Sequence, residues 1–259
     1  MLGNLLYRSR HTRVHRAPLV ALLGFMLATP TLAESPALEL DFESVDTGQR
    51  PPDLAFMDDF AGDSVLRIVD ADSDPADPFA DGETNRSLYV LDASDEHQPR
   101  FAWQLDEPIT DQGEFSIDVY FPEPDEQADT SPALLRIMIG QRRLDDAGEP
   151  STVTDNGPSL YLLEDGRIKT RTPDRMWSFD QSFPTGQVHT LTVAFDVAQQ
   201  TWTATIAGVP LTRSRGELES HPFHRTIERI DTVELSVGRP PHVGQHVFLD
   251  NLTLHGAKQ

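Results

Sequence analysis

Hydrophobic residues of this chain recur at every second position, and this period of two is the strongest single restriction on its fold. In residues 114–121, Phe115, Ile117, Val119 and Phe121 alternate with mainly polar residues. Successive side chains of a β-strand point to opposite faces of a sheet, so the pattern predicts a strand with one buried face. Beyond residue 33, no stretch of a dozen residues has the three- and four-residue apolar spacing of an amphipathic helix. The sequence therefore predicts an all-β protein.

The same alternation predicts roughly a dozen strands. Besides residues 114–121, they cover residues 38–42, 65–69, 87–91, 101–105, 134–139, 160–163, 167–171, 190–196, 201–206, 232–237 and 247–254. Asp165-Gly166 separates two of them and is typical of a tight hairpin turn. Each one-sided strand has to bury its apolar face against a second sheet, so we expect an antiparallel two-sheet β-sandwich. With no internal repeat or long linker, residues 34–259 are interpreted as one domain.

Residues 1–33 have the three parts of a secretory signal peptide. Four arginines precede the apolar run 19–27, which is too short for a full bilayer span, and Thr31-Leu32-Ala33 is typical of a cleavage site. We expect a mature chain that begins at Glu34, has no membrane span, and is secreted or periplasmic. With no cysteine, the chain cannot form a disulfide, a thiolate metal site or a lipidated N-terminal cysteine.

Acidic residues dominate the expected mature chain. Loss of the four arginines of residues 1–33 changes the formal charge from −21 to −25. Residues 34–135 carry −23 of it and residues 136–259 only −2. Such a charge disfavours binding to nucleic acid, and any polyanion would have to approach the second half of the chain.

Short motifs at both ends and in the middle resemble a known family. They are Asp41-Phe42-Glu43-Ser44 with Gly48 and Pro51, Val247-Phe248-Leu249-Asp250-Asn251-Leu252, and the hairpin Tyr161-Leu162-Leu163 to Lys169. Together they resemble bacterial concanavalin A-like (laminin-G-like) jelly-roll domains and carbohydrate-binding modules, across essentially the whole mature chain. The resemblance implies a jelly-roll sandwich, and it is less specific for function than for fold.

The resemblance also implies a structural calcium ion where the first and last strands meet. Carried over by position, its ligands are Glu43 and Asp250, with Asp41 as a neighbour. Asp250 alternates in register with Phe248, Leu252 and Leu254, and a carboxylate on a buried face needs a cation or strong donors. The alternative is that Asp250 faces solvent or bonds an arginine or a backbone amide.

A second acidic segment partly matches a helix–loop–helix calcium loop. Asp70, Asp72, Asp74 and Asp81 have the spacing of ligand positions 1, 3, 5 and 12. Pro75 stands where such loops need glycine, and a predicted strand precedes the segment instead of a helix. A solvated acidic loop at residues 70–83 is the favoured interpretation.

No catalytic residue is assigned from the sequence. It lacks the Gly-x-Ser-x-Gly elbow, the His-Glu-x-x-His zinc motif and a phosphate-binding glycine loop. A pair of carboxylates for glycoside hydrolysis cannot be identified in it. His189 shares the parity of Leu191 and Val193, so a hydrogen-bonded core histidine is favoured over a general base. The later histidines at 221, 224, 242 and 246 are interpreted as solvated loop residues.

Outward-facing aromatic and basic residues on the middle strands are the candidate ligand-binding residues. Sugar rings present C–H faces and hydroxyl groups, which suit aromatic rings combined with arginine donors. We place the candidates on one side of the sandwich: Tyr120, Arg136, Tyr161, Lys169, Arg171 and Trp177. The alternative is that the tyrosines cover the edge of the core and the arginines pair with acids.

The sequence thus predicts a noncatalytic protein that binds a polysaccharide or another glycan. Two alternatives stay open, namely a polysaccharide lyase or glycoside hydrolase of the same fold, and a structural or adhesion module without a glycan ligand.

Overall fold

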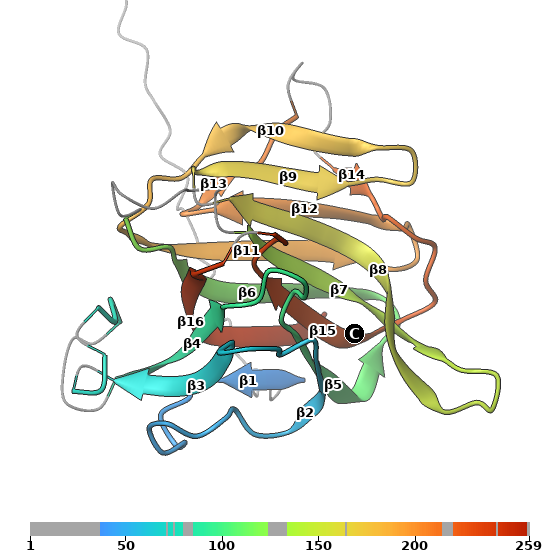
Figure 1. Cartoon of the computed structure of the whole chain (residues 1–259). Helices are drawn as coiled ribbons and strands as arrows, with labels where there is room; N and C mark the ends of the chain where they lie inside the picture. The colour runs from blue at the N-terminus through green and yellow to red at the C-terminus, as the bar shows by residue number, and fades with distance from the viewer. Residues whose placement is uncertain are drawn as a thin grey trace, which may run out of the picture. The chain divides into compact units, whose positions relative to one another are not determined.

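The computed structural model describes residues 37–70, 72–74, 76–79, 85–123, 134–163, 165–213, 220–241 and 243–257. The predicted signal peptide lies outside these residues. The described residues contain no helix and form two antiparallel β-sheets, which confirms the all-β prediction (Figure 1).

The larger sheet, sheet A, has nine strands. Seven of them lie in the order β13 (Val209–Pro210), β12 (Thr201–Ile206), β11 (Val188–Asp196), β6 (Gln112–Tyr120), β16 (Gln245–Gly256), β4 (Arg86–Asp92) and β3 (Val65–Asp70). In addition, β1 (Leu38–Leu40) pairs with β16, and β14 (His221–Pro222) pairs with β12.

Sheet B has seven strands. Their order is β10 (Met176–Ser182), β9 (Arg167–Arg171), β8 (Pro150–Leu163), β7 (Leu134–Leu144), β15 (Ile230–Val237), β5 (Arg100–Ile109) and β2 (Leu54–Asp58). Neighbours in both sheets come from distant parts of the sequence, as in the pairing of β15 with β5 and β7.

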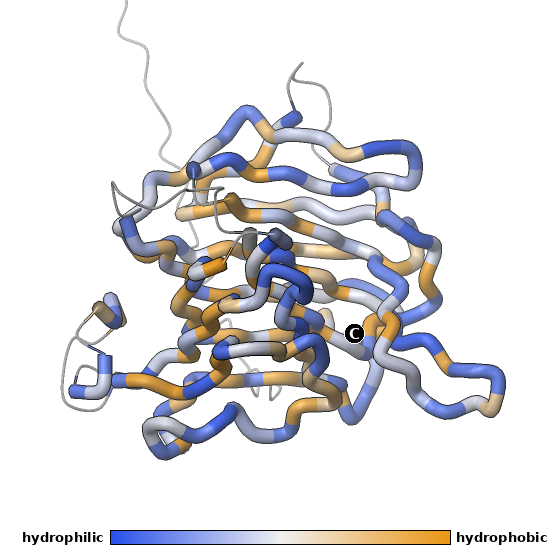
Figure 2. The backbone as a smooth tube through the Cα atoms, in the orientation of Figure 1, coloured by the Kyte–Doolittle hydropathy of each residue, from blue (hydrophilic) through white to orange (hydrophobic). Residues whose placement is uncertain are grey.

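The inner faces of the two sheets share one hydrophobic core. The alternating residues Phe115, Ile117 and Val119 of β6 are fully buried, as are Val233 and Leu235 of β15. Figure 2 shows hydrophobic segments along the strands and hydrophilic ones at many of the connecting loops. The period of two therefore identified the faces that pack together, and the two-sheet sandwich is confirmed.

The structure adds four strands that the alternation did not predict: β2, β10, β13 and β14. The last two contain only two residues each, too few to show a period. Both β2 and β10 are edge strands of sheet B, and each contains one buried residue. An edge strand needs less apolar surface than a central one, so its sequence signal is weak.

Candidate functional site

A row of polar residues crosses the outer face of sheet B. The registers of six neighbouring strands place directly beside one another, in order, Arg100, Ser236, Arg136, Tyr161, Lys169 and Ser178. Their sequence neighbours Leu235, Ile137 and Leu162 point into the core. Three of the predicted ligand residues therefore lie side by side, because strand pairing brings together positions far apart in the chain.

Arg136 and Tyr161 form the centre of this row. The guanidinium carbon of Arg136 lies 5.2 Å from the centre of the Tyr161 ring, within the range of a cation–π contact. Tyr161 is only 6% exposed. The Tyr161 ring therefore packs beneath the Arg136 guanidinium group. The open sugar-stacking surface expected from the sequence is not present there.

Several polar atoms around Arg136 are buried without a hydrogen-bond partner. They are Nε of Arg136 itself and the hydroxyls of Ser236, directly beside it, and Ser159, two residues along β8 from Tyr161. Most buried polar groups in proteins are paired, because an unpaired one costs about 1–3 kcal/mol. Three polar atoms on this face thus have no hydrogen-bond partner among the described residues.

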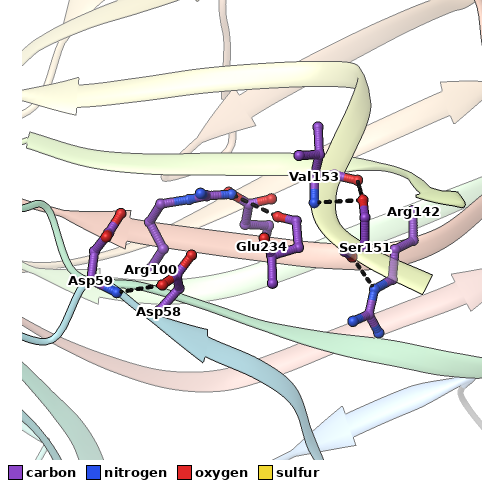
Figure 3. Close-up of polar contacts among 8 residues, drawn as sticks. Asp58, Asp59, Arg100, Arg142, Ser151, Val153 and Glu234 are labelled. Atoms are coloured by element: carbon purple, nitrogen blue, oxygen red, sulfur yellow. Dashed lines mark hydrogen bonds and ion pairs between the residues drawn. The ribbon is translucent and has the colours of Figure 1, made fainter. Parts of the chain in front are cut away.

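An ion pair on this face fixes the neighbouring strands. Nε and Nη2 of Arg100 donate to Oε1 of Glu234 at 3.0 and 2.8 Å (Figure 3). The Glu234 side chain is 2% exposed, so the carboxylate would be very costly to bury without this arginine. Arg100 therefore neutralises the buried Glu234 carboxylate, which water does not reach.

The far end of the β7–β8 hairpin bends over one part of the face. Arg100 on β5 donates to the carbonyl of Thr152 on β8, although β7 and β15 lie between these strands in the sheet. Arg142 of β7 donates to the Ser151 carbonyl and to Gln104 of β5, and it lies 5.5 Å from the Phe56 ring centre. The hairpin contacts the face near Arg100 and Arg142. The candidate site is therefore the other part of the row, which contains Arg136, Tyr161 and Lys169.

The remaining predicted ligand residues do not all join this face. Arg171 does, since it follows Lys169 by two residues on β9 and is exposed. Trp177 lies opposite Thr170, whose side chain is fully buried, and so belongs to the inner side at the β10 edge. The prediction that Trp177 shares a side with Tyr161 is wrong, because residues 176–182 form strand β10, whose pairing with β9 turns Trp177 to the inner side.

Tyr120 lies on the outer face of the other sheet. It pairs with Phe248, and their ring centres are 6.0 Å apart. Phe79 packs into the same small cluster from the loop after β3. The common side predicted for Tyr120 and Tyr161 is therefore wrong, because β6 and β8 belong to different sheets.

The acidic loop after β3 uses its carboxylates locally. Asp70 accepts from Thr47 Oγ1 and the Ser73 amide, and these bonds lower its pKa to about 2. Asp74 and Asp77 accept from the amides of Ala76 and Phe79. Asp77 is 6% exposed, so the loop is not uniformly solvated. Pro75 and Asp81 lie outside the described residues.

Asp250 is buried for a different reason from the one its spacing indicated. A register shift between Asp250 and Thr253, with Asn251 at φ 49°, turns Leu252 and Leu254 into the core and leaves Asp250 on the outer face of sheet A. There it lies directly beside Asp118 and is 2% exposed. Burial, together with repulsion from Asp118, Glu43 and Asp77, raises the pKa of Asp250 to about 7.

The three predicted calcium ligands do not converge. Asp41 accepts from the Glu43 amide, and Glu43 Oε1 accepts from the Arg86 amide. Within the described part of the chain, no three His, Asp or Glu side chains are close enough to share a metal ion. Glu43 and Asp250 do influence each other electrostatically, and Asp77 has a buried oxygen without a partner. Calcium binding therefore stays a prediction that rests on these oxygens.

The histidines divide into two groups. His189 is 7% exposed and its Nε2 lies 2.8 Å from the Pro184 carbonyl, which confirms a hydrogen-bonded core residue. His221 was expected in solvent but is fully buried against Trp202, with ring centres 4.8 Å apart. That prediction is wrong because β14 pairs with β12 and carries His221 inward. His242 lies outside the described residues.

A shallow hollow of about 390 Å³ lies where β6, β11, β12 and β16 come together in sheet A. Two carboxylates, Glu114 and Asp196, line it together with His255. They occupy diagonal positions on β6 and β11, for which spacings of about 7–8 Å are usual. A hydrogen bond from Gln112 lowers the pKa of Asp196, so this carboxylate stays ionised. This pair was not predicted from the sequence, because its two residues come from separate strands.

No protein-family model matches this chain, and no curated protein matches its sequence. Solved structures do match in fold. A sialidase chain superposes with a TM-score of 0.54 at 10% identity, over 86% of this chain and 19% of its own length. A carbohydrate esterase of the Shiga toxin-encoding bacteriophage phi24B gives 0.53 at 10% identity, over 86% and 99%. The alginate lyase vAL-1 from Chlorella virus gives 0.51 at 8% identity, over 86% and 100%.

At such low identities these likenesses concern the fold alone. In the described residues, no helix is long and apolar enough to cross a membrane. The two-sheet antiparallel architecture and the matched structures together confirm that the described residues form a β-sandwich with a concanavalin A-like fold.

Proposed function

We propose that this protein is a noncatalytic polysaccharide-binding protein that binds its ligand on the outer face of sheet B. The observation that carries the proposal is the Arg136–Tyr161 stack, with the unpartnered buried hydroxyls of Ser236 and Ser159 near it. Glycan association also agrees with the matched sialidase, carbohydrate esterase and alginate lyase, whose names all refer to carbohydrates.

Three cations of this face lack a carboxylate partner among the described residues. In the described residues, Arg136, Lys169 and Arg171 form no ion pair with a carboxylate, although the chain is strongly acidic. A guanidinium group donates in a fixed fork that fits neighbouring hydroxyls or a carboxylate. Arg136 and Lys169 lie on strands that are separated by one strand, so their backbones are roughly 10 Å apart. The face therefore suits an extended sugar chain better than a single small molecule.

Affinity electrophoresis through gels that contain single polysaccharides tests this function. Wild type should be retarded by at least one polysaccharide, and Arg136→Met should lose most of the retardation. Tyr120→Phe is the matched control, because Tyr120 lies on the outer face of sheet A. Equal retardation of both variants and wild type would place binding elsewhere, and no retardation by any polysaccharide would favour a structural or adhesion role.

A glycoside hydrolase is the second candidate function, and the Glu114–Asp196 pair is the observation that favours it. Hydrolysis needs one proton donor and one ionised carboxylate, and Asp196 fits the second role. Release of reducing ends that is lost in both Glu114→Gln and Asp196→Asn would establish it. Formation of unsaturated products would instead indicate a lyase.

A further inference from the structure

Arg213 is a buried cation that forms no ion pair with any carboxylate of the described residues. It pairs through its backbone with Phe179 at the β10 edge and is 9% exposed. Its Nε donates to Nδ1 of His221 at 3.1 Å, and its Nη2 is buried without any acceptor. A buried arginine normally has a carboxylate or several acceptors, because an unpaired charge is costly to desolvate.

The described neighbours of Arg213 do not neutralise it. His221 is fully buried, and burial lowers its pKa to about 4, so its ring is neutral at physiological pH. Burial lowers the pKa of Arg213, and repulsion from a second cation, Arg175, lowers it further. Within the described residues, neither arginine forms an ion pair.

Trp177 brings these two cations to the same ring. The guanidinium carbon of Arg175 lies 3.6 Å from the ring centre and that of Arg213 lies 5.1 Å from it. Contact with an aromatic ring stabilises a cation, but it does not remove the repulsion between like charges. The chain has twice as many acidic as basic residues, yet these two adjacent arginines have no carboxylate partner in the part of the chain that the structure describes.

We propose that Arg213 and Arg175, beside the Trp177 ring, bind an oxyanion, namely a carboxylate or a sulfate group. Two guanidinium groups offer planar donor pairs that match such oxygens, and the bound anion offsets their mutual repulsion. Arg213 is held by His221 and Arg175 stands exposed at the β9–β10 turn, so the second arginine can close on the anion. The site is separate from the outer face of sheet B, since Trp177 points to the other side of that sheet.

Thermal unfolding and tryptophan fluorescence of the full chain test this site. At constant ionic strength, sodium sulfate should raise Tm more than sodium chloride does. Trigalacturonate should change the fluorescence, and its fully methyl-esterified form, which lacks the charge, should not. In Trp177→Phe that change should disappear, which separates it from signals of Trp103 and Trp202.

Variants assign the effect to the two arginines. Arg175→Gln changes an exposed residue, so it should fold and bind about tenfold more weakly, the usual loss for a charged hydrogen bond. Arg213→Lys keeps the charge without the fork and should bind at least as weakly. Arg239→Gln, which changes another exposed arginine, should bind as wild type.

The probes distinguish the source of the anion. Equal affinity for sulfate and trigalacturonate supports a site for the free ion, and tighter trigalacturonate binding supports an acidic sugar. Equal binding of the methyl ester, unchanged binding in Arg175→Gln and Arg213→Lys, or no binding of either anion would overturn the proposal. The Trp177 signal reports on this site and not on the outer face of sheet B, so failure of the sheet B face does not affect the test.

Discussion

Arg136 of β7 and Tyr161 of β8 are directly opposite each other on sheet B, and the arginine lies over the tyrosine ring at 5.2 Å. Because of this contact, substitution of Tyr161 should affect stability as well as ligand binding. Tyr161 is nearly buried, so Tyr161→Ala should remove core-like packing and lower the free energy of unfolding by about 3 kcal/mol. Tyr161→Phe keeps the ring and should leave Tm within a few degrees of wild type.

Arg136→Met should separate binding from stability. The variant keeps a long side chain over the Tyr161 ring but loses the donors, so Tm should change little. Affinity for a retarding polysaccharide should fall about tenfold, as expected for loss of a charged hydrogen bond. Isothermal titration and thermal unfolding of the same samples give both values. A large fall in Tm with unchanged affinity would make Arg136 a structural residue.

The buried pair of Arg100 and Glu234 should be sensitive to loss of either partner alone. Glu234→Ala leaves Arg100 without its carboxylate and should cost about 3–5 kcal/mol, as for other broken buried pairs. Arg100→Met combined with Glu234→Met should cost less than Glu234→Ala, because no unpaired charge remains. Urea unfolding of the three variants checks this order. The reverse order would mean that the packing of the side chains matters more than their charges.

Stability should fall as the pH rises, because Asp250 has a raised pKa. Its pKa is about 7 in the native state and near 3.8 in the unfolded state, so the native state binds the extra proton between these values. The stabilisation is complete below about pH 4 and is lost as the pH passes 7, at a cost of about 4 kcal/mol for a shift of this size.

Urea unfolding from pH 5 to pH 8 measures this effect, and Asp250→Asn should flatten the profile. Asp92→Asn is the comparison variant. Burial raises the pKa of Asp92 to about 6, so its stabilisation is lost as the pH rises through 6, before that of Asp250 is lost. A wild-type profile that rises with pH would contradict the prediction.

Calcium should act on the same carboxylates. We propose that Glu43 and Asp250 contribute oxygens to a calcium ion, in which case calcium at pH 8 should raise Tm and chelator should lower it. An excess of one hundred times Kd corresponds to about 2.7 kcal/mol. Asp250→Asn and Glu43→Gln should abolish the response. Asp41→Asn should keep it, because the Asp41 carboxylate accepts from the Glu43 amide instead of facing Asp250. A Tm indifferent to both calcium and chelator would refute this proposal.

Export should remove residues 1–33, which we propose to be a signal peptide. N-terminal sequencing of protein from the periplasm or medium of its native host should begin at Glu34. An intact Met1 in that material would contradict it.

The alternation of residues in the sequence determined the fold class and most of the core. Phe115, Ile117 and Val119 were assigned to the core from their spacing, and His189 was placed with them correctly. This works because the burial of one strand face depends on a local period, which any short window of sequence displays.

Only the tertiary structure decided which of those faces meet. Tyr120 and Tyr161 have similar local patterns, yet strand order assigns them to different sheets. A single residue with positive φ, Asn251, reversed the face expected for Asp250 relative to Leu252. Arg213 and Arg175 meet at Trp177 because Arg213 pairs with Phe179, a residue 34 positions earlier in the chain. Charge environments of this kind arise from long-range contacts, so no local pattern in the sequence records them.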